Sequence, residues 1–291
     1  MMYVDCHSSN PSNIPIAGAF DFEAAFPSVI HEWIWMVLQH RKMPPHFIRL
    51  FRSIYKHARA IYIHQGKTNT LINFFSGVLQ GCPASAFLSN NALDPFLTNF
   101  DNVLIANKAG IVRACADDLG ISLRQLRHLQ LIYPIYVNCK DIGGLAFKPI
   151  KCVLVPMCKY TNEIQSKIKS WIAANLPLWS SFKVDPCAKF LGIYIGPAAG
   201  SKMWNGVIAK YNNRIREMQN GQAPLAISCL TYNSRIVPVF SYVSQLVPLP
   251  KSFEERYGMC SVIRAPRCMR TSDFYQLHKL GGPKFRSISL S

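Results

Sequence analysis

The chain has 291 residues, of which 49% are hydrophobic and 16% are charged. This balance excludes a disordered polar chain and is enough for one large or two medium folded domains. The 32 Lys and Arg residues against 15 Asp and Glu residues give a formal net charge of +17. Such an excess predicts a polyanionic partner, of which nucleic acid is the commonest.

The sequence contains no targeting or membrane segment that would change this interpretation. Its start, MMYVDCHSSNPSNIPIAG, lacks both a basic flank and an apolar core, which excludes a secretory signal peptide. No run of about 18 apolar residues and no lipidation motif occurs. The ten cysteines are scattered without zinc-ligand spacing, which indicates buried free thiols. We therefore expect an intracellular protein, nuclear or cytoplasmic, that is neither secreted nor membrane-bound.

The N-terminal part predicts a buried strand, two helices and a hairpin. Residues 14–22 are apolar and turn-bounded, as expected for a buried strand that ends at Asp21. One helix should follow Pro27, and another should cover 44–60, where a proline begins it. A hairpin around Gly66 comes next. The positions expected on the buried face of the 44–60 helix are Phe47, Phe51, Ile54 and Ala58.

The opposite face of the 44–60 helix carries basic side chains only. At 100° per residue Arg49, Arg52, Lys56 and Arg59 fall within a quarter turn of one another. Charges of one sign repel along a helix. The face is therefore either simply solvated or compensated by phosphates, and the second interpretation makes these four residues candidate nucleic-acid contacts.

The remaining elements predict an α+β fold. A helix ends near Phe100, strands over 111–115 and 119–122 flank two aspartates, and a helix covers 124–141. A glycine-containing loop then leads into another strand, a short strand covers 189–197, and the rest is mostly helical and basic. This order predicts a mainly antiparallel sheet with helices on one face.

The two adjacent aspartates, Asp117 and Asp118, lie in the turn of the 111–122 hairpin. Plain turn chemistry explains them on their own, since Asp favours turns. The other interpretation is a cation site, because Asp21 ends a strand that can neighbour this hairpin in one sheet. Three carboxylates that converge there suit Mg²⁺, which prefers a few carboxylates together with substrate phosphates.

A succession of motifs resembles the palm of reverse transcriptases, specifically those of non-LTR, LINE-like retrotransposons. AFDFEAAFPSV (19–29) is similar to the first palm motif of that family, SGVLQGCPASAFLSNNALDPFL (76–97) to its G-V-x-Q-G-C-P-x-S motif, and CADDL (115–119) to its Y/F-A-D-D-L turn. GLAFKPIKC (144–152) and FLGIYI (190–195) resemble the fourth motif and the primer-grip strand. Each motif alone is weak, but five in the right order favour the cation site over a plain turn.

The resemblance implies a role for each matching residue. Asp21, Asp117 and Asp118 would bind two Mg²⁺ ions, or Mn²⁺ in their place, with the backbone carbonyl of Phe22 as a further ligand. Lys151 would lie near the triphosphate and protonate the leaving pyrophosphate. The implied substrate contacts are Phe26 under the sugar of the dNTP, Gln80 and Gly81 beside nucleotide and template, and Leu191 and Gly192 at the primer end. The implied partners are an RNA template, a DNA primer and dNTPs.

Several departures from the family pattern bear on activity. Cys115 stands where an aromatic residue is expected, Lys148 replaces an Asn, and Cys152 replaces a Thr. The expected domains are a tail (1–13), a palm (14–200) with a partial fingers insertion at about 30–75, and a thumb-like basic helical region (201–291). Most of the fingers is expected to be missing, so we expect the chain to be a truncated copy or a gene-model fragment of a longer element.

Three functions follow in order of support. The first is an RNA-directed DNA polymerase that transfers dNMP to a primer 3′-end by two-metal catalysis. The second is a catalytically inactive nucleic-acid-binding remnant of such an enzyme, suggested by Cys115 and the missing fingers. The third, a two-metal nuclease, explains neither the QGCP sequence nor Phe26.

Overall fold

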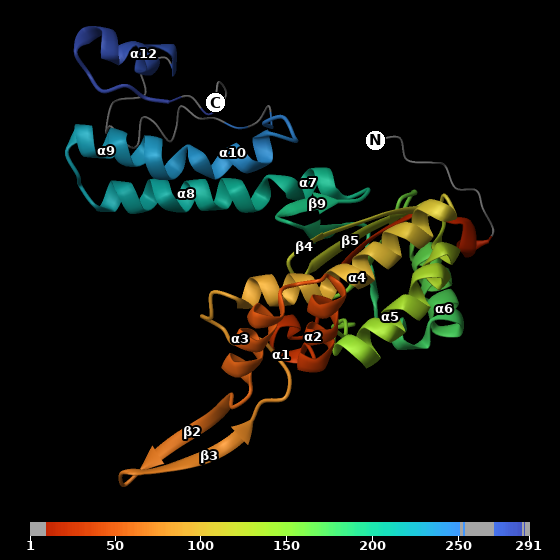
Figure 1. Ribbon diagram of the computed structural model, residues 1–291. Coiled ribbons are helices and arrows are strands. Elements are labelled where there is room, and N and C mark those ends of the chain that lie inside the picture. Colours follow the sequence, from red (N-terminus) through yellow and green to blue (C-terminus); the bar gives the residue numbers. More distant parts are fainter. Residues whose placement is uncertain (1–9, 251–252, 254–270, 287, 289–291) are drawn as a thin grey trace. The chain divides into compact units, whose positions relative to one another are not determined.

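The computed structural model describes residues 10–250, 253, 271–286 and 288 (Figure 1). The chain divides into two compact units, Met1–Pro197 and Ala198–Ser291. The division falls close to residue 200, where the sequence motifs place the end of the palm. Among the described helices none is both long and apolar enough to cross a membrane.

The first unit is built around a five-stranded sheet with the strand order β4-β5-β1-β6-β7. All neighbouring pairs are antiparallel except β6 and β7, which are parallel. This arrangement confirms the expected α+β fold with a mainly antiparallel sheet. The strands are β1 (Ile16–Asp21), β4 (Gly110–Cys115), β5 (Asp118–Leu123), β6 (Val153–Pro156) and β7 (Lys183–Val184).

Three helices cover one face of this sheet: α4 (Ser85–Ala106), α5 (Leu129–Gly143) and α6 (Asn162–Asn175) (Figure 1). Alternation along β1 sends Ile16 and Phe20 toward them, and both side chains are buried in the main hydrophobic core. Trp179 lies at the centre of this core, with its ring 5.9 Å from that of Phe20 and 5.3 Å from that of Phe182. Aromatic packing therefore fixes the sheet against its helices.

A small hairpin packs on the opposite face of the sheet. It consists of β8 (Ala188–Phe190) and β9 (Ile193–Ile195), two strands where the sequence predicts a single strand over 189–197. The strand breaks at Leu191 and Gly192, which have φ angles of 47° and 83°. Ala188 forms a second, smaller buried cluster with Ala17 and Val155. Both faces of the sheet are thus covered, with helices on one and the β8–β9 hairpin on the other.

The segment between β1 and α4 forms a separate layer of short helices and a projecting hairpin (Figure 1). Its elements are α1 (Ala25–Ser28), α2 (His31–His40), α3 (Pro45–Tyr55), β2 (Arg59–His64) and β3 (Lys67–Asn73). Every residue of β3 is exposed, and in β2 only Ala60 is half-buried.

The predicted orientation of the 44–60 helix is only partly correct, because Phe51 is half-buried against the main core but two of the other expected positions are exposed. Helix α3 ends at Tyr55, and it buries Ile48 and Tyr55, whereas Phe47 and Ile54 remain 46% and 45% exposed. The reason is the Tyr55 side chain, whose ring packs against His31 and Trp35 with centroid distances of 5.2 and 6.2 Å. Apolar spacing alone could not reveal that this tyrosine faces inward.

The described part of the second unit is helical, as the sequence predicts. Its helices are α7 (Ala199–Met203), α8 (Asn205–Asn220), α9 (Leu225–Thr231), α10 (Pro238–Ser244) and α12 (Thr271–Gln276). Phe240 is buried and packs its ring 5.2 Å from that of Tyr211. Most of the basic stretch that begins at Lys251 lies outside the described residues.

The cysteines that the structure describes are free thiols, as the sequence predicts. Burial raises the pKa of Cys139 and of Cys152 to about 12, which makes both thiols poor nucleophiles. Cys115, by contrast, is exposed.

Substitutions at Trp179 should show how much the aromatic core contributes to stability. Trp179→Ala is expected to lower the free energy of unfolding by about 3–5 kcal/mol, because it empties a fully buried site. Trp179→Phe should cost less than the alanine substitution, because it leaves a smaller cavity and the buried Nε1 of Trp179 has no hydrogen-bond partner to lose. Urea denaturation followed by circular dichroism measures both. As a control, Phe75→Ala at an 82% exposed position should change the free energy of unfolding by less than about 0.5 kcal/mol. If Trp179→Ala is as stable as the wild type, this account of the core is wrong.

Candidate active site

The three candidate carboxylates lie at one end of the central strands. In the register of β1 and β5, Asp21 is directly opposite Asp118, and Cys115 is opposite Asp118 on the other side. Side chains of directly opposed residues lie on the same face of a sheet, about 5 Å apart at Cβ. The face that carries Asp21 and Asp118 is the one covered by the β8–β9 hairpin, because Asp21 is two and four residues from Ala19 and Ala17.

Asp117 lies beside this pair in the two-residue turn that joins β4 to β5. The turn consists of Ala116 and Asp117, and Ala116 adopts a positive φ of 54°. A left-handed conformation at a residue other than glycine costs roughly 1 kcal/mol or more and is common at functional sites. The tight turn keeps Asp117 next to Asp118, with the Asp117 side chain exposed to solvent.

The electrostatics of the site reflect this crowding of negative charge. Partial burial raises the pKa of Asp118 above its ordinary value, and the neighbouring charges of Asp117 and Asp21 raise it further. The positive charge of Lys151 opposes this shift. The site is therefore one in which an added cation would be favourable.

Asp21 is held by its backbone and contacted by a lysine. Its carbonyl accepts a hydrogen bond from the backbone N–H of Lys148 at 2.8 Å. Its carboxylate Oδ2 lies 2.8 Å from Nζ of Lys151. That oxygen is buried and meets no donor in good hydrogen-bond geometry, so the contact is an ion pair with poor alignment. The close contact with Asp21, together with the charges of all three aspartates, raises the pKa of Lys151.

The donor set suits a hard divalent cation. Carboxylate oxygens are the ligands that Mg²⁺ and Mn²⁺ prefer, and the buried Oδ2 of Asp21, which already attracts the ammonium of Lys151, is an oxygen to which a cation could bind. The arrangement is not a complete protein cage: within the described residues, no three or more His, Cys, Asp or Glu side chains are grouped closely enough to hold a metal by themselves. Ligands from a substrate or from water would have to complete the coordination.

The two phenylalanines of the first motif occupy different environments. Phe22 is buried, and its ring lies 4.8 Å from that of Phe147. Phe26, in α1, is half-buried and packs at the edge of the core. Its carbonyl accepts a hydrogen bond from the N–H of Val78 at 2.7 Å, which joins α1 to the loop before α4.

The loop before α4 contains Gln80 and Gly81, both of which are exposed. Gly81 has a φ of 88°, and an added Cβ would meet no atom within 4 Å. Glycine is therefore needed here for its backbone conformation.

Three polar side chains that the sequence analysis did not single out hold this loop in place. The carbonyl of Gly77 is 2.7 Å from Nε2 of the buried His31. The Tyr55 hydroxyl accepts a hydrogen bond from the N–H of Leu79 at 3.4 Å, and Ser85 donates its hydroxyl to the Leu79 carbonyl. The only signal in the sequence was a histidine and a tyrosine within otherwise apolar helical patterns.

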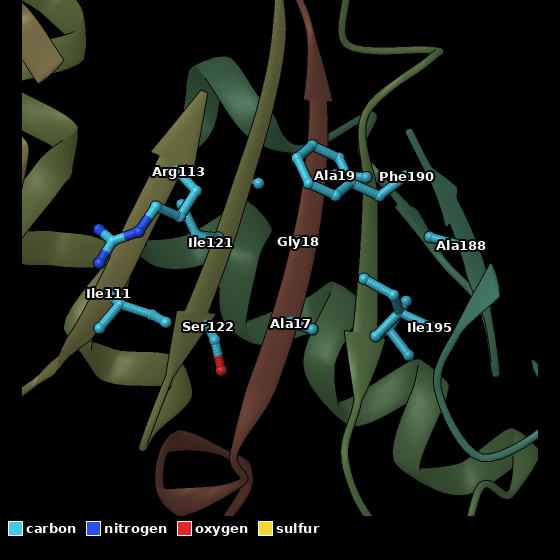
Figure 2. A pocket seen from close by; sticks show the side chains of 12 residues that line it. Ala17, Gly18, Ala19, Ile111, Arg113, Ile121, Ser122, Ala188, Phe190 and Ile195 are labelled. Atoms are coloured by element: carbon cyan, nitrogen blue, oxygen red, sulfur yellow. The ribbon is translucent and has the colours of Figure 1, made fainter. Parts of the chain in front are cut away.

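Leu191 and Gly192 form the turn of the β8–β9 hairpin. Next to this turn Phe190 packs on the sheet, where a Cβ on Gly120 would lie 2.7 Å from the Phe190 ring. The hairpin and the sheet border an apolar pocket of about 170 Å³ that is open to solvent on one side (Figure 2). The side chains that Figure 2 shows around it include Ile111, Arg113, Ser122, Ala188 and Ile195.

The four basic candidates do not form one helical stripe. Arg49 lies on α3 and Lys56 at its C-terminal end, but Arg59 begins strand β2, so the expectation that all four share a helix face is wrong. Arg52 is turned toward α2, where its guanidinium lies 3.8 Å from the Glu32 carboxylate and 5.9 Å from the centre of the Trp35 ring. Arg49, Lys56 and Arg59 are exposed.

Comparison with known proteins now adds to this geometry. Residues 5–195 match the family model described as "Reverse transcriptase (RNA-dependent DNA polymerase)". The chain belongs to this reverse transcriptase family. A Xenopus laevis protein described as "Transposon TX1 uncharacterized 149 kDa protein" is 32% identical over 199 residues, which are 66% of this chain and 13% of that protein. These findings confirm the resemblance to reverse transcriptases of non-LTR retrotransposons, and the reverse transcriptase chain spans about an eighth of that relative's length.

Solved structures that resemble the reverse transcriptase chain include telomerases of Candida species. Apo telomerase from Candida tropicalis gives a TM-score of 0.49 at 12% identity, covering 86% of this chain and 45% of that one. Telomerase from Candida albicans in complex with a fragment of telomeric RNA gives a TM-score of 0.42 at 10% identity, covering 92% and 44%.

The raised pKa of Asp118 predicts a pH-dependent gain in stability when its charge is removed. Above the raised pKa the folded state carries an unfavourable negative charge, which Asp118→Asn removes. The variant should therefore unfold at a higher temperature than the wild type at pH 8 in the presence of a chelator. As the pH falls through the folded-state pKa of Asp118, the wild-type residue becomes neutral and the gain should disappear.

Thermal unfolding of both proteins between pH 4 and 8 measures this difference. Asp141→Asn, which removes an exposed carboxylate at the end of α5, is the control and should show no comparable gain. A wild type more stable than Asp118→Asn at pH 8 would contradict the electrostatic account.

Proposed function

We propose that the chain is the catalytic core of an RNA-directed DNA polymerase of non-LTR retrotransposon origin, which acts in the nucleus or cytoplasm. Its reaction is the transfer of dNMP from a dNTP to a primer 3′-end on an RNA template. The observation that carries the proposal is the register of β1 and β5, which opposes Asp21 to Asp118 within the segment that matches the family.

Asp21, Asp117, Asp118 and the Phe22 carbonyl would hold two Mg²⁺ ions, or Mn²⁺. Such ions activate the primer hydroxyl and stabilise the leaving pyrophosphate in an in-line displacement. Phe26 would support the sugar of the dNTP, and Gln80 and Gly81 would border the nucleotide and the template. Lys151 would protonate the pyrophosphate, and Leu191 and Gly192 would hold the primer end. Support for these roles comes from the common sheet edge of the aspartates and the exposure of Gln80 and Gly81.

The layer between β1 and α4 is proposed to bind the phosphate backbone of the template and primer. From Trp33 to Leu93 the sequence contains seven Lys and Arg residues and no Asp or Glu. The β2–β3 hairpin also exposes Ile63 and Leu71 by 68% and 62%, and Phe75, which follows β3, is 82% exposed. Basic side chains interleaved with exposed rings suit single-stranded nucleic acid, whose bases stack and whose phosphates attract cations.

A second basic surface lies within the unit formed by residues 198–291. A groove there is lined by α8 and α9 and contains Lys210, Arg214 and Arg235. Arg214 donates a hydrogen bond to the backbone carbonyl of Arg235, which joins α8 to the segment that follows α9. We propose that this thumb-like unit contributes further phosphate contacts.

The polymerase proposal predicts that activity depends on the turn carboxylates. The double substitution Asp117→Asn/Asp118→Asn should lower primer extension on an RNA template by at least about a hundredfold, the scale of losing a key electrostatic element. Extension with Mg²⁺ or Mn²⁺ is measured beside Asp141→Asn, which should retain wild-type activity. Equal extension by the double variant and the wild type would refute the assignment.

The alternative function is an inactive nucleic-acid-binding remnant, which is favoured by the exposed Cys115 in place of an aromatic residue. It predicts binding to an RNA–DNA hybrid without extension by any divalent ion. Extension above the level of the double variant excludes it.

The phosphate contacts are tested by charge removal in the layer between β1 and α4. Arg49→Gln/Lys56→Gln/Arg59→Gln should weaken binding of single-stranded RNA and reduce the slope of log K against log salt by about 2–3, roughly one for each lost contact. Fluorescence anisotropy from 50 to 200 mM salt, with a chelator present, gives both quantities. The matched control, Lys140→Gln/Lys159→Gln/Lys169→Gln, removes the same charge from exposed positions outside this layer. If the two triple variants lose equal affinity, the cations act only through net charge.

A further inference from the structure

The turn that carries Lys151 is built onto Asp21. The backbone N–H of Lys148 donates to the Asp21 carbonyl at 2.8 Å, and the N–H of Lys151 donates to the Lys148 carbonyl at 2.9 Å. The thiol of Cys152 approaches the same Asp21 carbonyl at 3.8 Å. These contacts fix the start of the Lys151 side chain beside Asp21, so its ammonium group is within reach of the Asp21 carboxylate.

The ammonium group of Lys151 lies beside the buried carboxylate oxygen of Asp21. Its Nζ is 2.8 Å from Oδ2 of Asp21, an atom that is buried and has no aligned hydrogen-bond donor. The Asp21 side chain is 24% exposed, whereas the Lys151 side chain is 59% exposed. The lysine side chain can therefore leave for solvent, whereas the Asp21 side chain is mostly buried.

We propose that Lys151 is the internal counter-ion of the carboxylate site, and that a divalent cation must displace its ammonium group from Asp21 in order to bind. The proposal rests on the proposed metal site. It assigns Lys151 a role that precedes the chemical step: in the metal-free protein the lysine neutralises Asp21, which otherwise faces Asp118 across the strand pair.

Displacement couples two events at the site. When a ligand must break an existing contact in order to bind, the free energy of that contact lowers the affinity of the ligand. The Asp21–Lys151 ion pair should therefore lower the affinity for a divalent cation, and the bound cation should release Lys151. Lys151 could then contact a triphosphate only after the cation has bound.

The test is the affinity of the full chain for Mn²⁺ in the absence of nucleic acid and dNTP, measured from free Mn²⁺ by electron paramagnetic resonance. Lys151→Gln should bind Mn²⁺ about fivefold more tightly than the wild type, the scale of a partly exposed ion pair. Lys148→Gln removes the same charge from the same turn and should change the affinity by less than about twofold. Lys151→Arg keeps a cation beside Asp21 and should stay close to the wild type. Unchanged thermal unfolding of each variant shows that it is folded.

The outcomes separate this inference from the proposed function. If Asp118→Asn leaves Mn²⁺ binding unchanged, the metal site itself is refuted. If Asp118→Asn weakens binding but Lys151→Gln binds no more tightly than Lys148→Gln, the site stands and the displacement of Lys151 is refuted. The inference is supported if Lys151→Gln binds Mn²⁺ more tightly than the wild type while Lys151→Arg and Lys148→Gln stay close to the wild type.

Discussion

The antiparallel pairing of β1 with β5 is the constraint on which the rest of this structure depends. Six residue pairs run from Ile16 opposite Leu123 to Asp21 opposite Asp118. Because side chains alternate between faces, this register sends Phe20 into the aromatic core and Asp21 to the other face in the same strand. A slip of one residue would bury the carboxylate and expose the phenylalanine. The burial of apolar rings on the helical face therefore fixes the placement of charge on the opposite face.

The layers around the sheet serve this placement. The hydrophobic core packs β1 against the helices. The loop before α4 is joined to α1 by hydrogen bonds to the carbonyls of Phe26 and Val29. His31, Tyr55 and Ser85 hold the same loop from the other side. The turn that carries Lys151 is likewise attached to the backbone of Asp21. Hydrogen bonds between residues distant in sequence thus hold both the loop before α4 and the turn of Lys151, and the bond from Lys148 to Asp21 joins main-chain groups.

The sequence alone predicted the family, the α+β class, the strand that ends at Asp21 and the hairpin around Asp117 and Asp118. These follow from short-range patterns: apolar alternation, turn residues and ordered motifs. The orientation of α3 was not predictable, because an inward tyrosine held by Leu79, His31 and Trp35 depends on contacts between segments far apart in the chain. The stripe from Arg49 to Arg59 failed for a similar reason, since the helix ends at Tyr55. The ion pair between Lys151 and Asp21 also joins residues 130 positions apart, a distance at which spacing carries no information.

A divalent cation at the meeting point of β1 and β5 is the central claim of this account, and a crystal grown or soaked with Mn²⁺ tests it most directly. The account predicts an anomalous scattering peak about 2.1 Å from carboxylate oxygens of Asp21 and Asp118, with Nζ of Lys151 moved away from Oδ2 of Asp21. A crystal that contains Mn²⁺ at saturating concentration, shows no peak there and keeps Lys151 on Asp21 would contradict it.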